Sequence, residues 1–286
     1  LGAPVYQLLG GKANDDCRIY VNGWFAGAKT PDEFAEKARQ TVERGVTALK
    51  WDPFGKAYRQ LSSKELDNAL KCIAGVREAV GPDVDILIEA HGRFDVPTGI
   101  RVANEIAAFK PMFLEEPVPP DNLEALKAVR DKSPVPIAAG ERLYGRCGYR
   151  ELFSLRAADY VQPDVSHAGG IMETKKIAAI AESMQIPFAP HNPSGPVANA
   201  ATLQLAACCP NFCILEIMYS DVDYRSDVTD ESLEYTDGRI KIGNRPGLGI
   251  ELNEKECLKH PYVRHELRHY TGALTDIRPV NKKFYF

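Results

Sequence analysis

Short apolar segments alternate with longer segments of helical periodicity from residue 17 to residue 218. Most of the short segments stay apolar until their last one or two residues, which is typical of parallel strands covered on both faces. We predict strands at 18–22, 47–51, 85–90, 111–117, 136–141, 159–164, 187–191 and 213–217. We predict helices at 31–43, 63–79, 98–109, 122–131, 148–156, 171–184 and 197–208.

The order of these elements indicates the fold. Strand, helix and strand follow one another without an antiparallel interruption, which favours right-handed βαβ units. Eight strands with seven intervening helices, within about 200 residues, fit a β/α barrel. A doubly wound open sheet is the alternative, but no glycine-rich dinucleotide turn follows the first strand. The sequence therefore predicts a barrel over residues 17–218.

Both ends of the chain depart from this alternation. Residues 219–286 are polar and contain Gly and Pro turns, such as RPGLG at 245–249. We expect this segment to fold away from the barrel, on a second domain or over the barrel rim. The chain begins with LGAPVYQLLGGK and without an initiator Met, so we expect further residues on its N-terminal side.

Ionisable residues gather at the predicted strand ends, and the carboxyl ends of the strands form the active-site face of a barrel. These residues are Lys50, Asp52, Glu89, His91, Glu115, Glu116, Glu141, Asp164, His191 and Glu216. Nearly every strand therefore delivers such a group to one ring.

Three of these acids suggest a metal site. Glu89, Glu115 and Glu141 follow one another at intervals of 26 residues (89 to 115 and 115 to 141), which predicts equivalent heights on three adjacent strands. Converging carboxylates repel one another and raise their pKa values unless a cation is present. An oxygen-only ligand set suits Mg²⁺. The alternative is three solvated or salt-bridged loop acids.

Two histidines at strand ends are candidates for acid–base chemistry. Asp164 and His191 end neighbouring strands, and a carboxylate would fix the tautomer of the imidazole and make it a general base; a structural histidine is the alternative. His91 lies two residues beyond Glu89 and should share its face. It is a candidate acid or a further metal ligand.

The remaining strand-end groups have more open roles. Lys50 and Asp52 should also share a face; Lys50 is a candidate for steadying substrate charge, and an ion pair between the two is the alternative. Glu216 could donate a hydrogen bond if its pKa is raised, and a buried structural role competes with this.

Composition and charge indicate which binding partners and which cellular compartment to expect. The formal net charge of −4 and the 26% of charged residues give no reason to expect nucleic acid or an anionic membrane. The seven cysteines are odd in number and form no C-x-x-C pair, which favours a reducing compartment. No leader and no bilayer-spanning apolar run is present in the sequence. We therefore expect a cytoplasmic protein.

The motifs around these residues resemble the enolase superfamily. They are Glu89, LEEP with Glu115, AAGE with Glu141, QPD with Asp164 and APH with His191. Within that superfamily the chain is similar to mandelate racemase- and muconate lactonizing enzyme-like members, and above all to galactonate-dehydratase-like acid sugar dehydratases. The similarity also covers LGAPVYQLLGGK, AHGR, QPDVSHAGGI, APHNPSGP and PGLGIE.

The resemblance implies a TIM-type (β/α)₇β barrel and an α+β cap domain. Residues 1–16 would connect from the cap, 17–218 would form the barrel, and 219–286 would return to the cap, whose N-terminal part is missing. It also implies a homo-oligomer that binds Mg²⁺ and dehydrates an aldonate or aldarate to a 2-keto-3-deoxy acid. His191 would be the base, His91 the acid, Glu216 and Lys50 the groups that hold the enolate oxygens, and Asp52, Arg142 and Glu116 substrate-binding residues.

Two positions depart from the pattern of relatives. Asp52 stands where mandelate racemase carries the second Lys of a Lys-x-Lys pair, which argues against racemisation with a lysine base. Glu89 replaces the Asp that is often the first ligand. A racemase, epimerase or cycloisomerase on the same scaffold remains the nearest alternative, and a non-catalytic relative is a further one.

Overall fold

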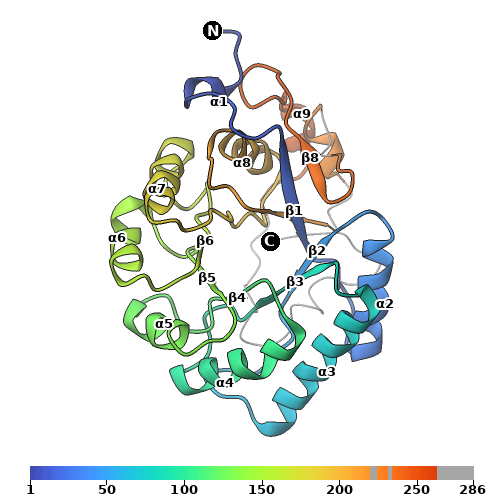
Figure 1. Cartoon of the computed structure of the whole chain (residues 1–286). Helices are drawn as coiled ribbons and strands as arrows, with labels where there is room; N and C mark the ends of the chain where they lie inside the picture. The colour runs from blue at the N-terminus through green and yellow to red at the C-terminus, as the bar shows by residue number, and fades with distance from the viewer. Residues whose placement is uncertain (220–223, 231–233, 263–286) are drawn as a thin grey trace.

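The computed structural model describes residues 1–219, 224–230 and 234–262 (Figure 1). Seven parallel strands form the centre: β1 (Asp16–Asn22), β2 (Ala48–Trp51), β3 (Asp85–Glu89), β4 (Leu114–Glu115), β5 (Ile137–Ala139), β6 (Tyr160–Val161) and β7 (Leu215–Met218). They are hydrogen-bonded in the order β6-β5-β4-β3-β2-β1-β7. The first strand thus pairs with the last as well as with β2.

The segment around Phe188 closes the barrel. Phe188 forms parallel bridges to Val161 on one side and to Phe212 on the other. The predicted strand at 187–191 is therefore reduced to this one bridging residue. Pro187 and Pro190 explain the difference, because proline has no N–H to donate to a strand ladder. The predicted barrel is confirmed.

Seven helices surround the strands as a ring (Figure 1). They are α2 (Pro31–Val42), α3 (Ser63–Val80), α4 (Val96–Ile106), α5 (Leu123–Arg130), α6 (Gly145–Leu155), α7 (Ile171–Ser183) and α8 (Pro196–Cys208), and the short 3₁₀ helix η1 (Ala107–Phe109) extends α4. All seven predicted helices are confirmed. Thr30 and Ser62 each begin a helix with a capping box, in which side chain and backbone satisfy one another's donors.

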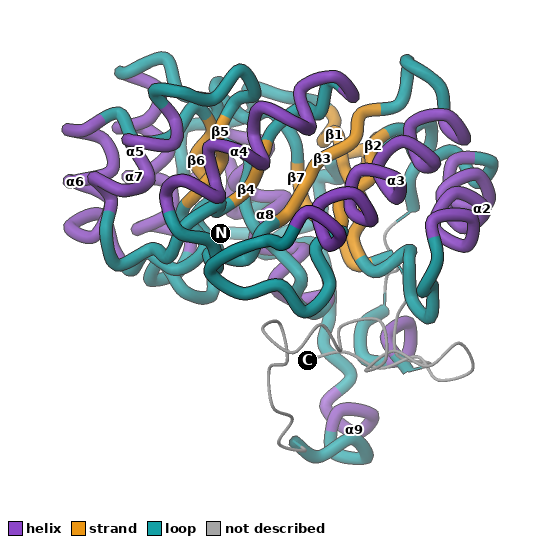
Figure 2. The backbone as a smooth tube through the Cα atoms, turned by 90° about the horizontal axis from the view of Figure 1, so that it is seen from below, coloured by secondary structure: helices purple, strands orange, loops and turns teal. Residues whose placement is uncertain are grey.

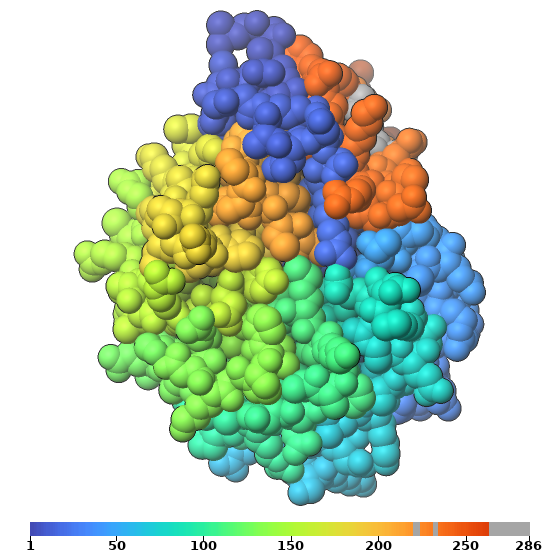
Figure 3. All heavy atoms as spheres, in the orientation of Figure 1, coloured from blue at the N-terminus to red at the C-terminus, as the bar shows by residue number. Residues whose placement is uncertain are grey.

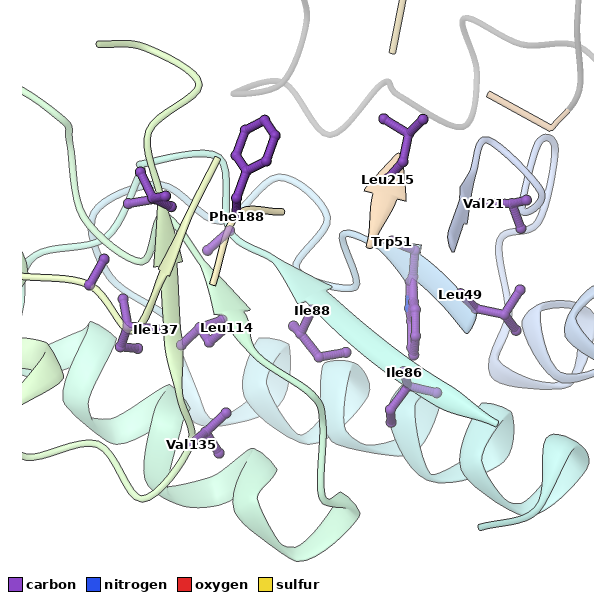
Figure 4. Packing of buried hydrophobic residues seen from close by; sticks show 14 of the residues in the cluster. Val21, Leu49, Trp51, Ile86, Ile88, Leu114, Val135, Ile137, Phe188 and Leu215 are labelled. Carbon is purple, nitrogen blue, oxygen red and sulfur yellow. The ribbon is translucent and has the colours of Figure 1, made fainter. Parts of the chain in front are cut away.

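Apolar side chains pack on both faces of the strands. One cluster fills the layer between strands and helices and includes Leu49, Trp51, Ile86 and Ile88 (Figure 4). A second, smaller cluster joins residues from around the ring: Tyr20, Ala48, Leu87, Phe113, Ala138, Ala189 and Ile214. Because successive side chains of a strand point to opposite faces, the second cluster fills the barrel interior.

The N-terminal segment lies beside the part of the chain around Gly247. The short helix α1 (Val5–Leu8) packs against α8, and the N–H of Val5 donates to the carbonyl of Gly247 at 2.9 Å. In Figure 3 the N-terminal residues and the region around 240–250 cover adjoining parts of the surface. Strand β8 (Arg239–Lys241) pairs antiparallel with the start of β1.

The helix α9 (Glu254–Cys257) lies beyond one end of the barrel (Figure 2). The 3₁₀ helix η2 (Arg225–Asp227) precedes it. A cavity of about 620 Å³ lies where this segment meets the barrel, and its lining includes Ser166, Ser194 and His260. Residues 219–286 therefore leave the alternating pattern as predicted, as far as they are described; residues 220–223, 231–233 and 263–286 lie outside the description. Their return to a cap domain stays a prediction.

All seven cysteines are free. Within the described ranges, none of the helices combines the length and apolar character that crossing a membrane requires.

Candidate active site

The interior of the barrel changes from apolar to polar along the strands. Leu87, Phe113 and Ile214 belong to the interior apolar cluster. Two residues further along each strand, on the same face, come the acids Glu89, Glu115 and Glu216. Ala48 precedes Lys50 and Ala189 precedes His191 in the same way. The apolar layer therefore forms a floor, and the ionisable groups stand above it at the carboxyl end of the barrel.

Glu89, Glu115 and Glu141 converge as predicted. Each offers one carboxylate oxygen in a set whose members all lie within 4.8 Å of one another, and all three residues are buried. The set draws on β3, β4 and the turn after β5. The fold therefore brings together the three ligands that the sequence predicts for a divalent ion.

The equal spacing predicted equivalent heights on three adjacent strands, and this is wrong for Glu141. Glu89 is the direct cross-strand partner of Glu115, but the partner of Glu115 on β5 is Ala138, not Glu141. Gly140 compensates, because its φ of +139° turns the chain away from strand geometry. A Cβ at Gly140 would lie 3.0 Å from the backbone N of Gln162. Only glycine fits that backbone without strain.

The carboxylates are in an environment that needs a cation. Burial and the neighbouring Glu89 raise the pKa of Glu115 to about 7, although Lys50 opposes the change. Burial, then Glu89 and Glu115, raise the pKa of Glu141 well above its ordinary value. Like charges this close are costly when water is excluded, and oxygen ligands suit a hard ion such as Mg²⁺. The residues therefore fit a divalent cation.

Lys50 points into the acid cluster and not toward open space. Its Nζ lies 2.8 Å from Oε2 of Glu115, 3.1 Å from Oε1 of Glu216 and 3.5 Å from Oε2 of Glu89. Burial alone would lower the pKa of Lys50, but Glu115 and Glu216 outweigh it and raise that pKa well above its usual value. Lys50 therefore pairs with these three glutamates, and not with Asp52 as the alternative interpretation held.

Glu216 is a hydrogen-bond acceptor. Asn22 donates its side-chain amide to Oε1 at 2.8 Å, and the backbone N–H of Asn192 donates to Oε2 at 3.1 Å. Burial raises the pKa of Glu216, but Lys50 and His191 outweigh it and bring the pKa to about 2. A raised pKa, the condition under which Glu216 could donate a hydrogen bond, is therefore not met, because its neighbours stabilise the charged form.

His191 and Asp164 form the predicted pair. Nδ1 of His191 lies 2.8 Å from Oδ2 of Asp164, and Nε2 lies 3.1 Å from Oε2 of Glu141. Burial raises the pKa of Asp164, but the hydrogen bond and charge of His191 lower it below its ordinary value. With Nδ1 engaged by a carboxylate, Nε2 is the atom that faces the carboxylate cluster and can exchange a proton.

His91 forms a second pair of the same kind. Its Nδ1 lies 2.7 Å from Oδ2 of Asp52, and Arg93, which is fully buried, pairs with the same oxygen. Burial lowers the pKa of the His91 imidazole, although the hydrogen bond to Asp52 opposes this. Two groups of side chains among the described residues could hold a metal ion: one is Glu89, Glu115 and Glu141, and the other is Asp164, His167 and His191. His91 belongs to neither group.

The backbone explains how His91 reaches this position. Strand β3 ends at Glu89, and His91 has a φ of +51°, a left-handed conformation that is uncommon for residues other than glycine. Its backbone N–H donates to Oε1 of Glu89 at 2.5 Å. The simple strand alternation that predicted a shared face therefore does not apply, and a turn held by a predicted metal ligand directs His91 instead.

Three predicted substrate-binding residues already have protein partners. Oδ1 of Asp52 accepts from the backbone N–H of Phe54 at 2.9 Å, and its other oxygen contacts His91 and Arg93. Arg142 pairs with Glu116, and its Nη2 lies 3.0 Å from Oε1 of Glu141. The side chains of Asp52 and Glu116 are nearly fully buried, while Arg142 keeps 26% of its side-chain surface exposed. Their contact with substrate stays a prediction.

Sequence reasoning missed two polar residues of the site. Gln162 donates its side-chain amide to Oε2 of Glu115 at 2.8 Å; its place in the QPD motif, two residues before Asp164, was the available signal. His167, which the sequence suggests is part of a local turn, has its ring centroid 6.1 Å from that of His191. Its Nδ1 lies 3.1 Å from the carbonyl oxygen of Glu141.

Comparison with known proteins agrees with this architecture. The family described as "Enolase C-terminal domain-like" matches residues 33–256, so the chain belongs to that family of the enolase superfamily. The mandelate racemase/muconate lactonizing enzyme-like protein from Rubrobacter xylanophilus DSM 9941 has a similar structure, with a TM-score of 0.83 at 39% identity, over 93% of this chain and 73% of that one. Its counterpart from Roseovarius sp. TM1035 gives 0.86 at 34% identity, over 92% and 69%.

Curated relatives are named as sugar acid dehydratases. The D-gluconate dehydratase of Thermoproteus tenax is 38% identical over 261 residues, which cover 91% of this chain and 52% of the relative. The D-gluconate/D-galactonate dehydratase of Picrophilus torridus is 36% identical over 256 residues, which cover 89% and 65%. The chain thus spans about half to two thirds of the length of these two relatives.

Proposed function

We propose that the chain is the catalytic barrel of a magnesium-dependent acid sugar dehydratase, a hydro-lyase for an aldonate or aldarate such as gluconate or galactonate. The observation that carries the proposal is the presence of two imidazole–carboxylate pairs, one on each side of a three-carboxylate cluster. Asp52 and His91 follow β2 and β3, and Asp164 and His191 follow β6 and the bridging residue Phe188. The names of the curated relatives support the same activity.

Glu89, Glu115 and Glu141 would hold the magnesium ion. When bound, such an ion would act as a Lewis acid that stabilises the negative charge developing on a substrate carboxylate. Gln162 and Lys50 orient Glu115 by donating hydrogen bonds to its carboxylate. Arg142, at the half-open side of the cluster, is the remaining candidate for contact with substrate oxygens.

His191 would act as the base. The C2–H bond of the sugar acid breaks, and its proton passes to Nε2 of His191, while Asp164 holds the opposite nitrogen. The electron pair of the broken bond is first held on C2 and the carboxylate. In a second step it forms the C2–C3 double bond as the C3–O bond breaks.

His91 would act as the acid. It protonates the departing 3-hydroxyl, which leaves as water, and Asp52 holds its opposite nitrogen. The resulting enol tautomerises, with a proton returning to C3, to a 2-keto-3-deoxy acid. Glu216 contributes by holding Lys50 and Asn192 in place.

Incubation of the protein with MgCl₂ and separate D-gluconate, D-galactonate and D-xylonate solutions tests the proposal. We expect one of them, or a related aldonate or aldarate, to give a 2-keto-3-deoxy acid, and we expect excess EDTA to stop the reaction and MgCl₂ to restore it. Turnover that persists in EDTA would reject the metal assignment. Release of an isomer without water would favour the alternative of an epimerase, racemase or cycloisomerase, which would share His191 and the metal.

The proposal also includes the domain organisation of the chain. We infer that residues 1–16 lead in from a cap domain and that 219–286 return to it. A homo-oligomeric state, a cytoplasmic location and a small-molecule partner in place of nucleic acid or membrane remain predictions from the sequence.

A further inference from the structure

The ammonium of Lys50 is enclosed by protein carboxylates. Its side chain is 1% exposed, and the acids it contacts come from three strands: Glu89 from β3, Glu115 from β4 and Glu216 from β7. Both oxygens of Glu115 accept from Nζ, at 2.9 and 2.8 Å. A buried cation with this many partners is directed at the protein and not at a ligand in the cavity.

The rest of the residue is fixed as well. The ring of Tyr20 lies 5.1 Å from Nζ, on the floor of the barrel, where its face can attract a cation. The indole N–H of Trp24 donates to the backbone carbonyl of Lys50 at 2.9 Å. Movement of the ammonium would leave buried carboxylates without compensation, which destabilises the fold.

Lys50 also lies next to the proposed metal ligands. It contacts Glu89 and Glu115, two of the three, and it contacts Glu216, which is outside the ligand set. Arg142 pairs with the third ligand, Glu141, from the more exposed side. The positive charge of Lys50 thus interacts both with two of the proposed metal ligands and with the buried Glu216.

We propose that Lys50 is the resident counter-cation of the carboxylate cluster: its charge keeps the metal-free site folded, and the same charge weakens the binding of a divalent ion. The first effect follows because buried carboxylates without a partner destabilise a fold. The second follows because an ion held by Glu89 and Glu115 lies beside a positive charge and is repelled. The inference rests on the proposed function only in taking these glutamates as the metal ligands.

The test compares Lys50→Met with the wild type at pH 8, in EDTA and with MgCl₂, by thermal unfolding and by calorimetric titration with Mg²⁺. We expect the metal-free variant to unfold at a lower temperature, its stabilisation by Mg²⁺ to exceed that of the wild type, and its Kd for Mg²⁺ to fall by about tenfold. An unchanged or weaker Mg²⁺ affinity would overturn the proposal.

Lys175→Met is the matched control. Nζ of Lys175 is also anchored, donating to the carbonyl of Cys208 at 2.6 Å, but it lies on α7 behind the barrel wall. We expect its loss to leave the Kd for Mg²⁺ and the stabilisation by Mg²⁺ as in the wild type. A metal-free unfolding temperature that falls as far in this control as in Lys50→Met would count against a special role of Lys50.

A second variant covers the case in which Lys50→Met does not fold without metal. Lys50→Met combined with Glu216→Gln removes one charge of each sign, so we expect it to regain metal-free folding relative to the single variant. No recovery would overturn the proposal. Because none of these readouts needs turnover, an inactive protein that shows the Lys50 effects would reject the proposed function alone, and an active one without them would reject this inference alone.

Discussion

Nδ1 of His91 lies 2.7 Å from Oδ2 of Asp52, although the two residues are 39 positions apart in the sequence. The contact repeats the 2.8 Å contact of His191 with Asp164. In each pair the carboxylate contacts Nδ1, which orients the imidazole ring and favours the tautomer that carries its proton on that nitrogen. The two pairs give the site one candidate base and one candidate acid.

The first prediction concerns Asp52→Asn. An amide in place of the carboxylate favours the wrong tautomer of His91, so we expect dehydration to fall by about 10²-fold or more, with little change in KM. Exchange of the C2 proton in D₂O, followed by NMR, should continue because His191 is untouched. Equal loss of exchange and dehydration would contradict the positioning role of Asp52.

Asp95→Asn serves as the control for this variant. Asp95 begins α4 by accepting from the N–H of Thr98 at 2.9 Å, and Asn is an equally good cap. Activity and stability should therefore stay within a small factor of the wild type.

The second prediction concerns His191→Asn. Removal of the base should abolish exchange of the C2 proton and dehydration together, by about 10²-fold or more. His260→Asn, which changes a histidine that stacks on Tyr224 and contacts Glu256, should leave both rates intact. Wild-type exchange in His191→Asn would assign the base to another residue.

The third prediction concerns Gly140→Ala. The new Cβ would lie 3.0 Å from the N of Gln162 in a backbone with φ of +139°, so we expect a loss of about 1–3 kcal/mol in the free energy of unfolding. Because Glu141 follows directly, Mg²⁺ affinity should fall too. Urea unfolding and calorimetry measure both.

Gly243→Ala is the matched control for Gly140→Ala. A Cβ at Gly243 meets nothing within 4 Å among the described atoms. Its stability and Mg²⁺ affinity should stay near those of the wild type. Similar losses in the two variants would remove the special role of Gly140.

The fourth prediction concerns pH. The folded-state pKa of Asp164 is lowered, so the stability it contributes is fully present above its unfolded pKa of about 3.9 and is lost as the pH falls through the folded value. The difference in free energy of unfolding between wild type and Asp164→Asn should therefore shrink below about pH 4. A difference that stays constant down to pH 2.5 would contradict the shift.

The candidate site shows where sequence reasoning was right for an incomplete reason. The 26-residue spacing identified Glu89, Glu115 and Glu141, and they do converge. The number of residues between two positions does not determine the register in which their strands pair, however. Glu141 lies three positions beyond Ala138, the partner of Glu115 on β5. The turn at Gly140 brings it back, and a backbone angle of that kind has no signature in periodicity.

The sequence by itself determined the elements, the barrel and the ring of ionisable strand ends. It could do so because apolar periodicity and the position of a residue at the end of a strand are local properties. The tertiary structure alone decided which of those groups meet. Lys50 faces the glutamates, while Asp52, two residues on, faces His91 and Arg93. Such pairings depend on register, strand closure and left-handed turns, which arise only when distant segments pack together.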